Sequence, residues 1–242
     1  AAEGEEAGAG IFACAPAETG HNHGSKVLYL NGDTLGFDTG WVGAVNSDEP
    51  NLSLDSWHHV AMVNDADEGV ISVYLDGEPI VHNESGDPVE GLEFEVAEFP
   101  EDEEFEGGVV NTGFRVGDGA IGFFADPFPG IMDNAAVWST ALSPEDIALL
   151  AGGASPLPDI VPLANVAPFL ESYWDFDTVD GEIVPDRSPN LPNHDGVLTG
   201  GAVITSGNQG FGNGGEALDT SAEENAHMAA MSPESYDFNS SF

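Results

Sequence analysis

The chain has 242 residues, of which 44 are Asp or Glu and only three are Lys or Arg, so its formal net charge is −41. Nucleic acids and anionic membrane surfaces are bound by clustered Lys and Arg, so this composition excludes both kinds of partner. Because 41% of the residues are apolar, a packed core is still possible, and we interpret the charge as a solvated surface suited to high salt. The sequence therefore predicts a folded, acidic protein from a halophilic or marine source.

Cysteine content and hydropathy bear on disulfide formation, on membrane insertion and on the presence of a signal peptide. Cys14 is the only cysteine, so no disulfide can form within the chain. No apolar run approaches the roughly 18 residues that a membrane-spanning helix needs, so we expect no membrane insertion. Residues 1–6 have neither the basic start nor the apolar stretch of a signal peptide, which indicates a mature chain or a piece of a longer one.

Residues 57–63 and 71–81 predict three consecutive antiparallel strands. Apolar residues alternate at period two in both segments, which places one face of each strand in a core. Between the second and third strands, Asp76-Gly77 predicts a type I′ turn, because both central residues of that turn need a positive φ. Residues 114–117 are typical of a further strand.

A short helix is predicted over residues 144–151. Ser143 is a suitable N-cap, Pro144 suits the first helical position, and Asp146 lies where the acid of a capping box reaches back to the N-cap. Gly152-Gly153 then ends the helix. Residues 154–169 follow with four prolines, a composition that favours a semi-extended linker.

Two blocks, Trp57–Val81 and Phe128–Ile147, resemble the central signature of laminin G-like and pentraxin-like domains. These domains belong to the concanavalin A-like lectin/glucanase jelly rolls. The resemblance implies an all-β fold, an antiparallel jelly-roll β-sandwich with one short helix near 144–151.

The motifs of this family occur in an inverted order. Tyr173–Asp177 resembles the family's opening strand, and Gly215–Asp219 resembles another early strand, although both follow the helix that ends a family domain. We therefore divide the chain into residues 1–153 with the later strands, the linker 154–169, and residues 170–242 with the early strands.

Two arrangements are compatible with this order. In a circular permutant, the linker joins the old ends and one sandwich closes within the chain. In a head-to-tail array or filament, the last third of each chain completes a neighbouring copy. One core strand of the family has no counterpart between Phe242 and Ala1, and an unpaired sheet edge is usually covered. We expect completion of the sandwich by β-strand addition, within or between chains.

The resemblance also suggests a calcium site. The loop Asp219–Asn225 stands where the family has a turn that often supports calcium, and Asp133-Asn134 stands in place of the family's Asp-Asp pair. Oxygen ligands from separated loops suit Ca²⁺. The candidate ligands are Asp133, Asn134, Glu223, Glu224 and Asn225, although each could also be an ordinary surface acid or turn residue.

Three other patterns are weaker. His21-Asn22-His23 lacks a third ligand for zinc. His58-His59 has no recognisable nucleophile beside it, so we interpret one histidine as buried and the other as outward-facing. Glu93, Glu95 and Glu98 have the spacing of the E-x-D-x-x-E strand of jelly-roll glycoside hydrolases, with Glu95 in place of the family's Asp. They lie in an acid-rich segment that is more typical of a solvated ribbon or loop.

The sequence thus predicts a non-catalytic extracellular or cell-surface module for recognition or adhesion. It would bind a glycan or protein, with calcium as the expected cofactor. The alternatives are a structural subunit of a surface fibre and, less favoured, a glycoside hydrolase. Fold alone does not decide between them.

Overall fold

The computed structural model describes twelve stretches of the chain. They comprise residues 8–15, 26–39, 43–47, 52–53, 55–65, 70–80, 113–118, 126–157, 163–189, 193–207, 215–223 and 225–231. Several sequence predictions concern residues outside these stretches, namely His21–His23, Glu93–Glu98, Glu224 and Phe242. Those predictions remain as stated above.

One layer of the molecule is a nine-stranded sheet that is antiparallel along its main path. In spatial order its strands are β13 (Ile183–Val184), β14 (Gly196–Thr199), β17 (His227–Met231), β8 (Gly113–Val116), β1 (Ala9–Ala15), β2 (Lys26–Asn31), β3 (Thr34–Thr39) and β4 (Gly43–Asn46), while β9 (Asp126–Pro127) pairs in parallel with β1.

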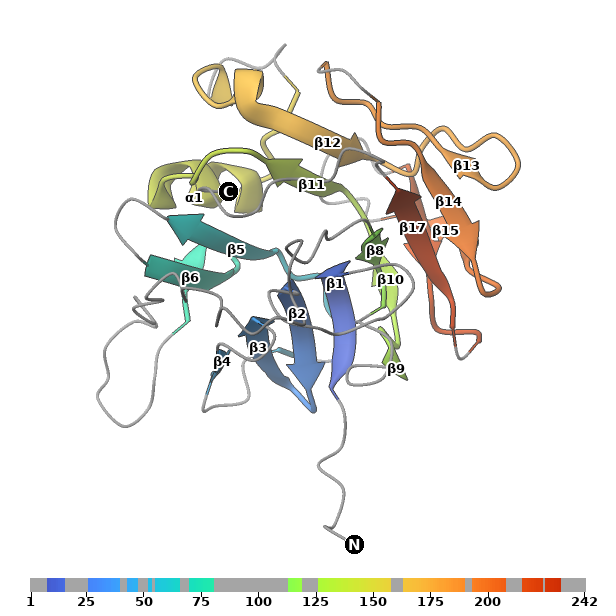
Figure 1. The fold of residues 1–242 in the computed structure, drawn as a ribbon, viewed down its shortest axis with the longest axis horizontal. Coiled ribbons are helices and arrows are strands. Elements are labelled where there is room, and N and C mark those ends of the chain that lie inside the picture. The colour runs from blue at the N-terminus through green and yellow to red at the C-terminus, as the bar shows by residue number, and fades with distance from the viewer. Residues whose placement is uncertain are drawn as a thin grey trace, which may run out of the picture.

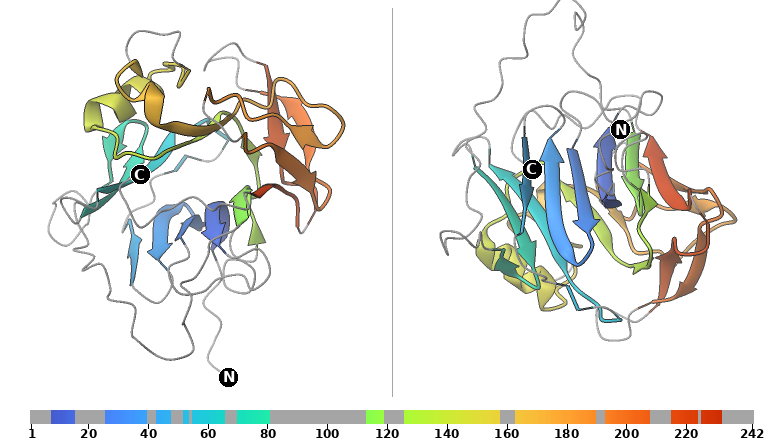
Figure 2. Two further views of the ribbon diagram at one scale, coloured as in Figure 1. Left: turned by 45° about the horizontal axis from the view of Figure 1, so that its top comes forward. Right: turned by 90° about the horizontal axis from the view of Figure 1, so that it is seen from below.

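The opposite layer consists of three smaller sheets. They are β5–β6–β7 (Val60–Asp65, Val70–Leu75 and Glu78–Pro79), β11–β12 (Ala135–Trp138 and Leu170–Trp174) and β10–β16–β15 (Ile131–Met132, Glu216–Asp219 and Val203–Ser206). Figures 1 and 2 show β1–β4 in one layer, with β5, β6, β11 and β12 in the layer across from them. The predicted antiparallel jelly-roll sandwich is confirmed.

The predicted hairpin forms at the end of β6. Asp76 has φ 52° and Gly77 has φ 88°, the two positive values that a type I′ turn requires. Gly77 also packs against the helix α1 (Pro144–Ala151), because a Cβ added at this position would lie 3.2 Å from Cα of Ala148. The glycine is therefore needed both for the turn and for close helix packing.

The predicted helix α1 occupies the predicted residues, with both caps in place. The Ser143 side chain accepts the N–H of Asp146 at 3.2 Å, and the Asp146 carboxylate accepts the N–H of Ser143 at 3.2 Å. At the other end, Gly153 has φ 88° and donates its N–H to the carbonyl of Leu150, while Ala154 donates to Leu149. This pair of bonds is a Schellman motif. A single 3₁₀ turn, η3 (Ala167–Phe169), precedes β12.

Strands from the two ends of the chain pair with one another. β17 pairs with β8, β16 with β10 and β12 with β11, all antiparallel. The ring of Phe114 on β8 stacks on Trp174 of β12 at a centroid distance of 5.4 Å, and both side chains are at most 1% exposed. The described strands after residue 170 therefore share one core with the earlier strands.

Candidate functional site

A group of polar side chains lies where β10 leads into β11 and where β12 ends. We call it the Tyr173 cluster and define it as Asp133, Asn134, Tyr173, Asp175, Asp177, Thr178 and Arg187. All seven residues line one end of a groove of about 1380 Å³ that continues between the two layers. The pairing of β11 with β12, with Ala136 opposite Tyr173, brings the two segments together.

One half of the cluster is organised around Asn134. This residue has φ 57°, a left-handed conformation that Asn tolerates better than most residues. Its amide donates to Oδ1 of Asp133 at 2.9 Å, and its Oδ1 accepts the hydroxyl of Tyr173. The tyrosine is 6% exposed, so this bond fixes an exposed amide against a buried ring.

The other half is organised around the loop after β12. Asp175 forms a salt bridge with Arg187 at 3.1 Å and accepts the N–H of Asp177 at 3.1 Å. Arg187 also donates to the hydroxyl of Thr178 at 3.1 Å. Asp177 accepts the N–H of Glu216 at 2.7 Å, which ties the loop to the start of β16. The loop is thus held rigid before any ligand binds.

The electrostatics of the cluster follow from burial and from its excess of carboxylates. Burial raises the pKa of Tyr173, and the negative charges of Asp175, Asp133 and Asp177 raise it further, while Arg187 opposes them. Burial also raises the pKa of Asp175, against the attraction of Arg187. The tyrosine therefore remains a neutral hydroxyl that can donate and accept hydrogen bonds at physiological pH.

The structure separates the two halves of the predicted calcium set. Asp133 lies beside Gly207, which bonds to Gly215 just before β16. Glu223 and Asn225 lie beyond the other end of β16, beside the turn at Gly200 and Gly201. The four residues of β16 span about 13 Å. Within the described residues, no three His, Cys, Asp or Glu side chains gather as a metal site. The calcium site stays a prediction, and Asp133-Asn134 is the half that joins the cluster.

A second constellation, which the sequence did not reveal, surrounds His58. Its Nδ1 lies 2.8 Å from Oδ2 of Asp76, and its Nε2 lies 3.0 Å from Oγ of Ser53. These distances match those of a Ser-His-Asp triad. The sequence showed no recognisable nucleophile beside either histidine, because Ser53 and Asp76 lie 5 and 18 residues from His58 along the chain.

The surroundings of His58 favour a structural role. Its Nε2 is also 3.1 Å from the carbonyl oxygen of Ser53, and a carbonyl can only accept a hydrogen bond. Nε2 is thus shared between the hydroxyl and the carbonyl oxygen of the same residue, whereas the general base of a triad is directed at the hydroxyl. The other Asp76 oxygen accepts the N–H of His59 at 2.9 Å. Together these hydrogen bonds hold the start of β5 against the Asp76-Gly77 turn.

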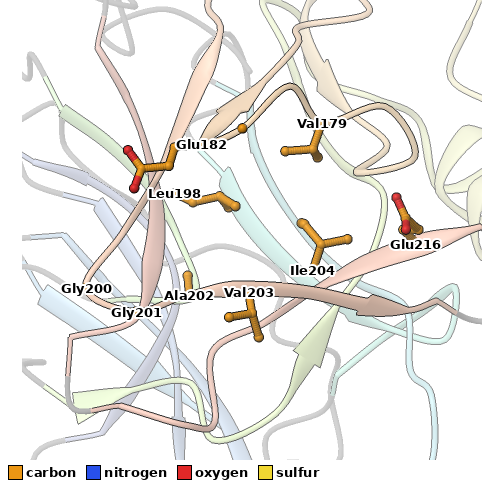
Figure 3. Close-up of a pocket in the computed structure, with 10 residues that line it drawn as sticks. Val179, Glu182, Leu198, Gly200, Gly201, Ala202, Val203, Ile204 and Glu216 are labelled. Atoms are coloured by element: carbon orange, nitrogen blue, oxygen red, sulfur yellow. The ribbon is translucent and has the colours of Figure 1, made fainter.

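A second, shallower pocket of about 470 Å³ lies between the 179–182 turn and the turn that joins β14 to β15 (Figure 3). Its labelled side chains are mostly aliphatic, including Val179, Leu198 and Ile204, with Glu182 and Glu216 at the sides. Those three aliphatic residues also pack against the core. The pocket offers few hydrogen-bonding groups, so the Tyr173 cluster is the better candidate for binding a polar ligand.

The described residues include no helix that is long and apolar enough to cross a membrane. No curated protein matches the chain at a significant level. Among solved structures, it is similar to a candidate carbohydrate-binding protein from Bacteroides ovatus ATCC 8483, with 18% identity and a TM-score of 0.41. That match covers 75% of this chain and 45% of the other, so this chain spans less than half the length of that protein.

A family model of laminin G type, described as the concanavalin A-like lectin/glucanases superfamily, matches residues 5–148. The match contains both sequence blocks on which the resemblance was based, and it covers more than half of the 242 residues. The chain belongs to the concanavalin A-like lectin/glucanases superfamily.

Proposed function

We propose that this domain is a non-catalytic recognition module that binds a neutral glycan at the Tyr173 cluster. The observation that carries the proposal is the convergence of three carboxylates, an amide, a guanidinium and two hydroxyls at one end of a groove, in a domain of a lectin-containing superfamily. The surplus of acidic groups disfavours an anionic ligand. Extracellular or cell-surface adhesion is the setting we propose.

Sugar hydroxyls both donate and accept hydrogen bonds, and the cluster supplies both kinds of partner. Carboxylates of Asp133 and Asp177 accept, the guanidinium of Arg187 donates, and the hydroxyl of Thr178 does either. Asp177 and Thr178 are exposed, whereas Tyr173 is buried beneath them. A ligand would thus meet fixed polar groups on a buried support, which reduces the entropy lost on binding.

Binding is favoured over glycoside hydrolysis because both oxygens of the half-buried Asp175 carboxylate already bond to other parts of the domain. Asp175 uses Oδ2 for Arg187 and Oδ1 for the N–H of Asp177. A glycosidase needs one carboxyl group to give up a proton and a second to attack or to activate water. A carboxylate whose two oxygens already accept from a guanidinium and a backbone N–H has no oxygen left to attack a sugar or to activate a water.

The proposal is tested by screening neutral glycans and measuring the Kd of the best ligand by calorimetry. Asp177→Ala should weaken binding by about ten- to a hundredfold, the loss expected for a hydrogen bond to a charged group. Asp180→Ala is the matched control, because Asp180 is an exposed acid three residues away and outside the groove lining. It should leave Kd unchanged.

Three results would contradict the proposal. The first is that the wild-type domain binds no neutral glycan. The second is that Asp177→Ala and Asp180→Ala weaken binding equally although both variants keep the wild-type Tm, which would place the ligand elsewhere. The third is the release of reducing sugar from any bound glycan, which would show catalysis.

A further inference from the structure

The shallower pocket between the 179–182 turn and the turn that joins β14 to β15 has no part in the proposed glycan site. We call it the Val203 pocket. Its described lining shares no residue with that of the groove that holds the Tyr173 cluster. Its volume of about 470 Å³ is within the range of about 300–1000 Å³ that is typical of small-ligand sites. The pocket is therefore a separate candidate for binding.

The wall of the Val203 pocket is aliphatic. It consists of the side chains of Val179, Leu198, Ala202, Val203 and Ile204. All of these except Val203 pack against the core cluster that contains Trp174, so the wall is continuous with the interior of the domain. Val203 itself is 48% exposed. A ligand thus meets an apolar surface that is open to solvent, and covering that surface favours an aliphatic group.

The backbone around the pocket is fixed by contacts with the rest of the domain. The N–H of Leu198 donates to the carbonyl of Glu182 at 2.8 Å, which ties the 179–182 turn to β14. Gly200 has φ 65°, and a Cβ at this position would collide with the carbonyl oxygen of Asn225. The turn between β14 and β15 therefore packs closely on the segment that precedes β17. Because the pocket is formed by packed backbone, a ligand need not order it on binding.

Two carboxylates stand at the sides of the aliphatic wall. Figure 3 shows Glu182 on one side of the group of aliphatic side chains and Glu216 on the other. Both side chains are exposed. Glu216 is held through its backbone, because its N–H donates to Asp177 at 2.7 Å and it pairs with Ser206 of β15. The pocket thus combines an apolar wall with two acceptors of negative charge, which suits a cation with an aliphatic chain.

We propose that the Val203 pocket binds an aliphatic primary ammonium group. The alkyl chain lies against the aliphatic wall, and the ammonium group is directed toward Glu182 and Glu216. Lysine side chains behave in this way on protein surfaces, where the stem covers apolar atoms and the charged end stays in water. A ligand carboxylate would be repelled by both glutamates and by the net charge of −41.

A free alkylamine and a lysine side chain of another protein both carry the required group. The chain itself contains one lysine, Lys26, which lines the groove of the Tyr173 cluster rather than this pocket. A second copy of this chain is therefore a poor source of the ammonium group. The acidic surface attracts cationic molecules and raises their concentration near the pocket, so the ligand is a cationic amine or a basic partner protein.

Methyl NMR of the full-length chain tests the proposal with hexylammonium, hexan-1-ol and hexanoate, in about 0.15 M NaCl to screen distant charges. We expect saturable shifts of the methyl groups of Leu198, Val203 and Ile204. Hexylammonium should bind about tenfold more tightly than hexan-1-ol, the gain expected from two exposed ion pairs. Hexanoate should bind most weakly of the three.

Four variants separate the two parts of the pocket. Glu182→Gln and Glu216→Gln should each weaken hexylammonium binding about two- to fivefold and leave hexan-1-ol binding unchanged. Asp180→Asn is the matched control, because Asp180 is an exposed acid of the same turn that does not line the pocket; it should change neither. Val203→Thr keeps the shape of an exposed side chain but removes apolar contact, so it should weaken both probes. The Tm of each variant checks that the fold is kept.

Three results would overturn the proposal: shifts that do not saturate, hexan-1-ol binding as tightly as hexylammonium, and equal losses in Asp180→Asn and Glu182→Gln. The last would show a diffuse attraction to the acidic surface. A further probe, Nα-acetyl-lysine N-methylamide, identifies the source of the ammonium group. If it shifts the same methyl groups and is weakened by Glu182→Gln, the source is a lysine of a partner protein, whereas binding of hexylammonium alone indicates a free alkylamine.

Discussion

Replacing Tyr173 by Phe removes one hydroxyl from the Tyr173 cluster and leaves the packing of the ring in place. That hydroxyl donates to Oδ1 of Asn134. A hydrogen bond of this kind contributes about 0.5–1.5 kcal/mol to the free energy of unfolding. Asn134 is exposed, so water can bond to its oxygen in the variant. We therefore expect a loss of about 1 kcal/mol at neutral pH, or about 2–4 °C in Tm for a domain of this size.

The effect of Tyr173→Phe should change sign at alkaline pH. Burial and the neighbouring carboxylates raise the pKa of Tyr173 in the folded protein, whereas an unfolded tyrosine titrates near about 10. Above that pH the unfolded chain loses a proton that the folded protein retains. The wild type then loses about 1.4 kcal/mol of stability per pH unit through this group. Phe has no ionisable group, so the stability of the variant does not fall in this way at alkaline pH.

Urea unfolding of both proteins between pH 7 and pH ~11 measures this difference, and the other titrating groups cancel in the comparison. Asn134→Gly supplies the matched partner, because glycine keeps the positive φ at this position. The double-mutant cycle should give a coupling of about 0.5–1.5 kcal/mol. A stability difference that stays constant up to pH ~11 would refute the assignment of a buried, neutral tyrosine among carboxylates.

Three shorter predictions concern other parts of the fold. His58→Gln should lower the free energy of unfolding by about 1 kcal/mol, because it removes the hydrogen bond to Asp76, and Ser53→Ala should lower it by less than about 0.5 kcal/mol. Hydrolysis of p-nitrophenyl acetate that depends on Ser53 would instead reveal a working triad. Gly77→Ala should cost about 1–3 kcal/mol, because φ is 88° and Ala148 is close; an unchanged Tm would contradict this. If Asp133 helps to bind calcium, a hundredfold excess over Kd should stabilise the domain by about 2.7 kcal/mol; a Tm unaffected by chelator at fixed ionic strength would count against the site.

The sequence predicted best those features that a few neighbouring residues determine. The Asp76-Gly77 turn depends on two residues that tolerate positive φ. The start of α1 depends on Ser143 and Asp146, three positions apart, which bond to each other's backbone. In both cases the residues that form the structure are adjacent in the chain, so the pattern was visible without knowledge of the fold.

The functional candidates depend instead on strand pairing between distant segments. Asn134 and Tyr173 are 39 residues apart, and they meet because β11 pairs with β12. The Ser53–His58–Asp76 constellation depends on the register of β5 and β6, which brings residues 18 apart into contact. Family resemblance located Asp133-Asn134 and Tyr173–Asp177 in two separate motifs, but it gave no reason to expect that their side chains would meet.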